Sequence, residues 1–240
     1  MTSHTTVRDG KARRGPDTHS DAPEVMYVRR YAGLQRVNHW VTAILFTLLT
    51  LSGLAMFTPY LFSLTGIFGG GGATRAIHPW FGVALVISFG LLFLKFWRSN
   101  LPNKDDVEWS LKIGDVVTNR EDRLPELEKY NAGQKGVFWG QTILIGVMFV
   151  TGLMIWEQYF YEYTTIETQR WALLAHSLAA VVAIAIIFVH IYAGIWVRGT
   201  SRAMLRGTVT GGWAYRHHRK WFREVAGGER GPVPSDKSGA

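Results

Sequence analysis

Two histidines lie within one long apolar run, and their spacing places both imidazoles on the same face of a helix. The run covers residues 171–197 and contains no Asp, Glu, Lys or Arg. His176 and His190 are fourteen residues apart, which is nearly four full turns of a helix and roughly 21 Å along its axis. A helix of this length can cross a bilayer. Because neutral imidazole is a good ligand for iron, the pattern indicates two redox centres at two depths of a membrane.

Three other apolar runs have the length and composition of membrane-spanning helices. The only charge within them is Lys95, which lies near the end of its run and can reach the membrane interface. The four predicted spans cover about residues 37–58, 77–97, 137–156 and 171–197. We therefore predict an all-α membrane protein, a bundle of four transmembrane helices.

The composition restricts the cofactors and the domain organisation. The 240 residues include no cysteine, which excludes disulfides, thiolate-held iron–sulfur clusters and covalently attached haem within them. Residues 1–28 and 224–240 are polar and are predicted to be disordered tails, which leaves 29–223 as the membrane domain. No internal repeat is evident in the sequence.

Basic residues are unevenly distributed among the connecting segments. The middle connector and both tails are rich in Lys and Arg, whereas the first and third connectors together hold only Arg75 and Arg170. The positive-inside rule predicts that both termini lie in the cytoplasm, with the chain in the inner membrane of a bacterium. The basic segment 215–223 is interpreted as the same topology signal, attracted to anionic lipid rather than to nucleic acid. His217 and His218 lie in this segment and are expected to be solvated.

With this topology the four membrane histidines form two pairs at matching depths. His78 and His176 lie near the outer face, and His39 and His190 lie near the cytoplasmic face. Two imidazoles on facing helices can ligate one haem iron from both sides, so the pattern predicts two b-type haems. A single histidine in a membrane helix has another interpretation, a hydrogen bond to a neighbouring helix.

Three glycines near the predicted ligands also have two interpretations. Gly53 follows His39 by fourteen residues, and Gly82 and Gly194 each follow a predicted ligand by four. A glycine would let a macrocycle approach the helix backbone. Small residues in membrane helices more often permit close helix packing, and we favour this second interpretation.

Five short segments carry a resemblance to a known family. They are RVNHW (36–40), IHPWFG (77–82), YNAGQK (130–135), WALLAHS (171–177) and VHIYAGIWVRGT (189–200). Together they resemble the gamma subunit of respiratory membrane-bound formate dehydrogenases, a four-helix di-haem cytochrome b, over roughly residues 29–223. In that family the outer haem is held by the histidines that match His78 and His176. The inner haem is held by those that match His39 and His190, which agrees with the pairing by depth.

The resemblance implies that the chain is an electron-transfer subunit of a formate:quinone oxidoreductase. The implied partners are an iron–sulfur (beta) subunit at the outer face, to which loops 59–74 and 157–170 are candidate contacts, and a molybdenum or tungsten catalytic (alpha) subunit. Electrons would pass through two haems b to menaquinone or ubiquinone. The family places the quinone beside the inner haem, at positions that match Asn131, Gly133 and His190. The residues alone favour a turn at this segment.

Two alternatives to this function remain open. A cytochrome b subunit of a hydrogenase or of another molybdenum oxidoreductase would share the haems and differ in its partners. A haem-free membrane anchor, in which the histidines bridge helices, is an alternative from another class. These 240 residues contain no molybdopterin-sized domain, so we expect the chain itself to perform no formate chemistry.

Overall fold

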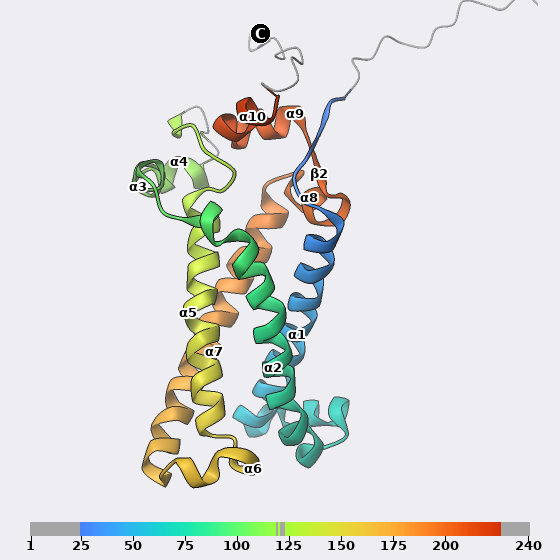
Figure 1. Ribbon diagram of the computed structural model, residues 1–240, viewed down its shortest axis with the longest axis vertical. Coiled ribbons are helices and arrows are strands. Elements are labelled where there is room, and N and C mark those ends of the chain that lie inside the picture. The colour runs from blue at the N-terminus through green and yellow to red at the C-terminus, as the bar shows by residue number, and fades with distance from the viewer. Residues whose placement is uncertain (1–24, 119, 121–122, 227–240) are drawn as a thin grey trace, which may run out of the picture.

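Four long apolar helices form the body of the protein (Figure 1). The structure is a computed structural model, and it describes residues 25–118, 120 and 123–226. Most of the two predicted tails, residues 1–24 and 227–240, lies outside this part. The long helices are α1 (Gly33–Phe57), α2 (Gly71–Phe96), α5 (Ala132–Met154) and α7 (Ile166–Trp196). Each is long and apolar enough to cross a membrane, which confirms the four predicted spans.

All four helices begin before their apolar runs do, and polar caps define the starts of α5 and α7. At α5 the Asn131 Oδ1 accepts from the Gln134 backbone N–H at 2.8 Å, and Gln134 Oε1 accepts from the Asn131 N–H at 3.1 Å. At α7 the Thr165 hydroxyl accepts from the Thr168 N–H at 3.2 Å. Such caps satisfy backbone donors that the first helical turn leaves unpaired. Hydropathy therefore locates the span but not the start of its helix.

Many apolar side chains of these helices point outwards, and they expose more apolar surface than a soluble protein does. Leu34 is 80% exposed and Ile195 is 74% exposed, and many large apolar side chains on all four helices share this property. A continuous apolar surface of this kind is typical of helices that face lipid. The protein is therefore a multi-pass membrane protein.

The four helices are arranged as two hairpins. In Figure 1, α1 packs along α2 and α5 packs along α7, while contacts between α2 and α5 and between α1 and α7 join the hairpins. The first hairpin is connected by η1 (Pro59–Phe68), and the second by α6 (Glu157–Phe160) and η4 (Tyr161–Tyr163). These connections lie at one end of the bundle, here called the distal end.

The opposite end carries a group of short elements, here called the cap (Figure 1). Strands β1 and β2 pair antiparallel, with Tyr27 opposite Thr210. The sequence analysis did not predict them, and β1 begins within the predicted N-terminal tail. The cap consists of β1 (Tyr27–Arg29), η2 (Trp97–Asn100), α3 (Lys104–Leu111), α4 (Ile113–Val117), α8 (Thr200–Arg206), β2 (Thr208–Thr210), α9 (Gly211–His217) and α10 (Arg219–Ala226).

A buried arginine joins the segments of the cap. Arg30 donates to the Lys129 carbonyl at 2.5 Å and lies 3.3 Å from His218 Nε2. Its guanidinium lies within 6 Å of the ring centres of Tyr31, Tyr130, Trp213 and Trp221. The prediction that His218 is solvated is wrong, because its side chain is only 1% exposed. Much of the basic segment 215–223 is thus part of a packed structure.

Candidate functional site

The structure brings the four membrane histidines into the two predicted pairs. His78 on α2 and His176 on α7 form the distal pair, with ring centres 6.4 Å apart. His39 on α1 and His190 on α7 form the cap-side pair, with ring centres 6.3 Å apart. Helix α7 therefore contributes one imidazole at each level, and each hairpin contributes one ring to each pair.

Both separations fit a metal between the two rings. Two imidazoles that bind one iron from opposite sides, each at about 2 Å, hold their ring centres roughly 6 Å apart. Among the described residues no group of three or more His, Cys, Asp or Glu could hold a metal ion. A bare ion would have too few ligands at such a pair, whereas a haem brings four nitrogens of its own and needs two axial ligands. The residues fit haem iron at both levels.

A hydroxyl group on a neighbouring helix contacts the Nδ1 atom of each distal imidazole. Ser52 Oγ on α1 lies 2.7 Å from His78 Nδ1, and Thr151 Oγ1 on α5 lies 3.0 Å from His176 Nδ1. Both hydroxyl residues are buried. Sequence reasoning missed them.

The backbone determines the direction of these two hydrogen bonds. Ser52 donates its hydroxyl proton to the Leu48 carbonyl at 2.7 Å, and Thr151 donates to the Val147 carbonyl at 2.7 Å. Since a hydroxyl has one proton, each oxygen must accept from the imidazole Nδ1–H. The tautomer with a proton on Nδ1 carries its lone pair on Nε2, the nitrogen that would bind iron.

A glycine follows each of these hydroxyl residues and lies against the same imidazole. A Cβ added to Gly53 would lie 3.4 Å from Cε1 of His78, and one added to Gly152 would lie 3.4 Å from Cε1 of His176. Larger side chains would reach into the rings. Both contacts are with a side chain of the neighbouring helix, which agrees with the favoured helix-packing interpretation of Gly53.

The two hairpins repeat this arrangement, although no repeat was recognised in the sequence. The segments LSGL (51–54) and VTGL (150–153) each place a hydroxyl residue and a glycine near the distal end of the first helix of a hairpin. This short similarity is the signal that could have identified them. Gly82 and Gly194 have open space around an added Cβ.

A cavity of about 990 Å³ surrounds the distal pair. His78 and His176 line it, together with residues from all four long helices. This volume is at the upper end of the range for ligand pockets. Arg75 and Arg170 also line the cavity, and neither forms an ion pair with any residue of the described ranges. Their positive charges suit the two carboxylates of a haem.

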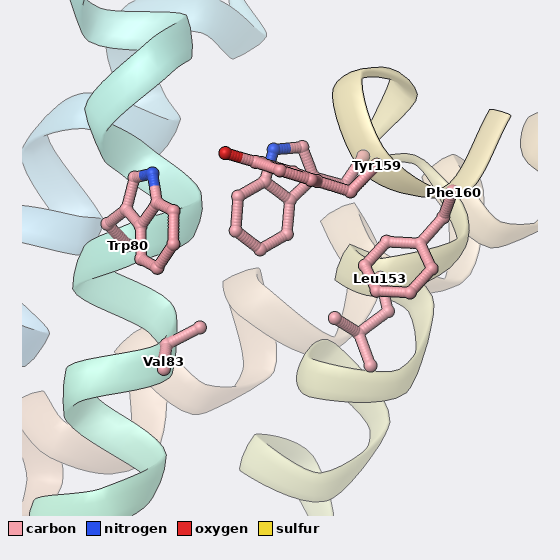
Figure 2. Close-up of a pocket in the computed structure, with 6 residues that line it drawn as sticks. Trp80, Val83, Leu153, Tyr159 and Phe160 are labelled. Carbon is pink, nitrogen blue, oxygen red and sulfur yellow. The ribbon is translucent and has the colours of Figure 1, made fainter.

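Aromatic side chains gather beside this cavity at the distal end (Figure 2). The Trp80 and Trp156 ring centres are 5.2 Å apart, and those of Trp156 and Tyr159 are 5.0 Å apart. With Phe160 they line a hollow of about 290 Å³ that has no histidine and no charged side chain in its lining. Aromatic groups of this kind are typical of a membrane–water interface, and we assign no ligand to the hollow.

The cap-side pair has a different environment. The Nδ1 atom of His39 is buried and has no hydrogen-bond partner in the described part of the chain. His190 likewise has no hydrogen bond to a described residue. The two pairs thus match in spacing and differ in the support of their imidazoles.

The structure gives the predicted quinone residues local structural roles. The Asn131 carbonyl caps α5, as the turn interpretation expects, and its amide nitrogen has no part in that cap. A Cβ added to Gly133 would lie 3.1 Å from Trp109 Cη2, so this glycine packs against α3. No hydrogen bond or ring contact joins either residue to His190 in the described ranges. The quinone assignment stays a prediction.

Comparison with known proteins identifies the family. Residues 30–207 match the family described as prokaryotic cytochrome b561. The chain is 43% identical over 196 residues to the formate dehydrogenase cytochrome b556(fdo) subunit of Escherichia coli (strain K12), covering 82% of this chain and 92% of that protein. The chain belongs to the family of formate dehydrogenase cytochrome b556 subunits. The resemblance found in the sequence is confirmed.

Two further relatives agree with this placement. The nitrate-inducible cytochrome b556(Fdn) subunit of the same E. coli strain is 38% identical to this cytochrome b over 192 residues, or 80% of this chain and 88% of the relative. The cytochrome b556 subunit of Haemophilus influenzae formate dehydrogenase is 38% identical over 189 residues, or 79% of each chain. Membership in a cytochrome b family implies haem b as the cofactor of this chain.

Proposed function

We propose that this cytochrome b is the membrane subunit of a formate dehydrogenase and that it passes electrons from an iron–sulfur subunit to membrane quinone. The observation that carries the proposal is that one bundle holds two pairs of imidazoles at two levels. The ring centres are 6.4 Å apart in one pair and 6.3 Å apart in the other. His78 and His176 would hold one haem b, and His39 and His190 a second. Each haem, when bound, supplies a one-electron iron couple.

The protein itself would orient the ligands, and α7 carries no charged side chain between them. Between His176 and His190, α7 has no ionisable side chain. The interior of the bundle therefore offers no carboxylate relay along this helix, which favours an electron carrier over a proton channel. The hydroxyl groups on α1 and α5 would hold the distal imidazoles with Nε2 free to bind iron.

The charge distribution supports an orientation for the bundle. The cap and the connectors at its end contain most Lys and Arg residues, whereas Arg75 and Arg170 are the basic residues of the two distal connections. We place the cap and both termini in the cytoplasm of a bacterium and the distal end outside the inner membrane. An iron–sulfur (beta) subunit would then contact η1 and the α6 segment, and a molybdenum or tungsten (alpha) subunit would oxidise formate beyond it.

We place the quinone site on the cytoplasmic side, beside the cap-side pair. His190 has no hydrogen bond to a described residue, so its Nδ1–H could donate to a quinone oxygen. The Asn131 amide nitrogen and the Gly133 backbone, at the start of α5, offer further donors at the same end of the bundle. Protons for reduction of menaquinone or ubiquinone would come from the cytoplasm.

The proposal is tested with the complex that co-purifies with an affinity-tagged chain. We expect an iron–sulfur subunit and a molybdenum or tungsten subunit in it, b-type haem that formate reduces, and a membrane potential when proteoliposomes oxidise formate with quinone. Reduction by hydrogen gas, and not by formate, would instead indicate a hydrogenase cytochrome b. A purified chain without haem would contradict the proposal and favour a membrane anchor.

A further inference from the structure

We infer that Ser52 and Thr151 are positioning residues that set the reduction potential of the distal centre below that of the cap-side centre. The inference rests on the proposed function, because it concerns the iron that the two histidine pairs would hold. It follows from hydrogen bonds that the described residues form with one pair and not with the other.

The distal imidazoles are hydrogen-bond donors at the nitrogen opposite the metal. Ser52 and Thr151 each donate to their own helix backbone, so each can only accept from the Nδ1–H of its imidazole. A hydrogen bond of this kind makes the imidazole a more basic ligand. A more basic axial ligand stabilises ferric over ferrous iron, which lowers the reduction potential.

Burial maintains the direction of the hydrogen bond from His78 to Ser52. The Ser52 side chain is 0% exposed, so water cannot replace its hydroxyl as the acceptor. The 2.7 Å bond to the Leu48 carbonyl also prevents the hydroxyl from turning round to donate to His78. The bond from His78 therefore has one direction.

The contribution of Ser52 is expected to exceed that of Thr151. The bond between Ser52 and His78 is 2.7 Å long, whereas the bond between Thr151 and His176 is 3.0 Å long. The shorter hydrogen bond increases the basicity of its imidazole more.

The cap-side imidazoles lack such support. The Nδ1 atom of His39 is buried without a partner, and His190 has no hydrogen bond to any described residue. No described residue increases their basicity in this way, so iron held between them would have the higher potential. An electron that moves from the distal to the cap-side level, towards the negative side of an energised membrane, works against the field. A lower potential at the distal level offsets that cost.

Potentiometry of the purified complex, followed by the haem absorption bands, tests the inference. The variant His176→Ala shows which of the two signals belongs to the distal centre. In Ser52→Ala the ratio of reduced to oxidised distal haem at a fixed potential should rise by up to about tenfold, a shift of up to about 59 mV for one electron. In Thr151→Val the shift should have the same sign and be smaller, and the cap-side potential should not change in either variant.

Two matched threonines provide controls for the loss of a hydroxyl. Thr47 on α1 and Thr142 on α5 bond only to the carbonyl four residues earlier. Thr47→Val and Thr142→Val should leave both potentials unchanged. Ser52→Thr keeps the hydroxyl and should therefore have the wild-type distal potential. If Ser52→Ala fails to retain haem, Ser52→Cys, a weaker acceptor, should give an intermediate shift.

Unchanged distal potentials in variants that keep both haems would overturn the inference, as would equal shifts at both levels. Absence of haem from the wild-type complex would instead overturn the proposed function, so the two failures are distinguishable.

Discussion

The histidines and the residues that support them differ in how much the sequence reveals. His176 and His190 are identifiable because ionisable side chains are rare in membrane spans and their spacing gives a common helix face. Ser52 and Thr151 are not, because a hydroxyl residue in a membrane helix usually bonds its own backbone, as Thr47 does. Only the position of one helix against another shows which hydroxyls also contact an imidazole.

Substitution of Gly53 tests the close approach of α1 to a ligand. A Cβ at this position would already touch the His78 ring at 3.4 Å, so the branched side chain of Gly53→Val would displace the imidazole. We expect the purified variant to lose the distal haem and keep the cap-side haem, which halves the haem content per chain. The control is Gly146→Val on α5, where an added Cβ meets nothing within 4 Å. Full haem content in Gly53→Val would count against the site.

Among the elements, the long helices were predicted and the cap was not. An apolar run of membrane-spanning length is a strong local signal. Strands β1 and β2 are three residues long each and come from opposite ends of the chain. No local sequence pattern predicts their pairing. A basic segment that packs around a buried arginine also has the same composition as a solvated tail. For the predicted quinone residues the sequence is ambiguous, because Asn131 fits a helix cap and a ligand contact equally well.

The buried histidine of the cap gives it a pH dependence. Burial, followed by the nearby Arg30 charge, holds the pKa of His218 well below its usual value. Its Nδ1–H donates to the Glu128 carbonyl at 2.7 Å, and its Nε2 accepts from Arg30. His218 binds a proton when the cap opens and not while the cap is closed. The free energy of cap opening is therefore highest above about pH 6.5. It decreases as the pH falls below this value, by at most about 1.4 kcal/mol per pH unit.

Hydrogen exchange of the purified complex between pH 7.5 and pH 5 measures this effect. After correction for the intrinsic exchange rate, α9 and α10 should lose protection as the pH falls, while α6 should not. His218→Gln should remove most of this dependence, and the neighbouring His217→Gln should retain it. A pH dependence that survives in His218→Gln would assign it to another group.

At the scale of the whole molecule, charge and connectivity together determine which end faces which side. An even number of spans places β1 and α8 to α10 at the same end, as Figure 1 shows. The pairing of the helices into hairpins is not contained in hydropathy, which treats all four spans alike. It arises from packing, and it is the packing that brings α2 and α1 each against α7 at a histidine.

The orientation can be tested by labelling, because the chain has no natural cysteine. Ser63 in η1 and Ser110 in α3 are exposed at opposite ends of the bundle. In cells that produce this chain without its partner subunits, a membrane-impermeant thiol reagent applied from the periplasmic side should label Ser63→Cys and not Ser110→Cys. In inverted membrane vesicles the result should be the reverse. Labelling of Ser110→Cys from outside would contradict the proposed sidedness.

The most direct test of two haems in two histidine pairs is a count of haem per chain. A pyridine haemochrome assay with reduced-minus-oxidised spectra would be applied to the purified wild-type protein and to His176→Ala and His190→Ala. We predict two non-covalent b-type haems in the wild type and one in each variant, with a different spectral component lost each time. No haem in the wild type, or a haem content that neither substitution changes, would contradict the account.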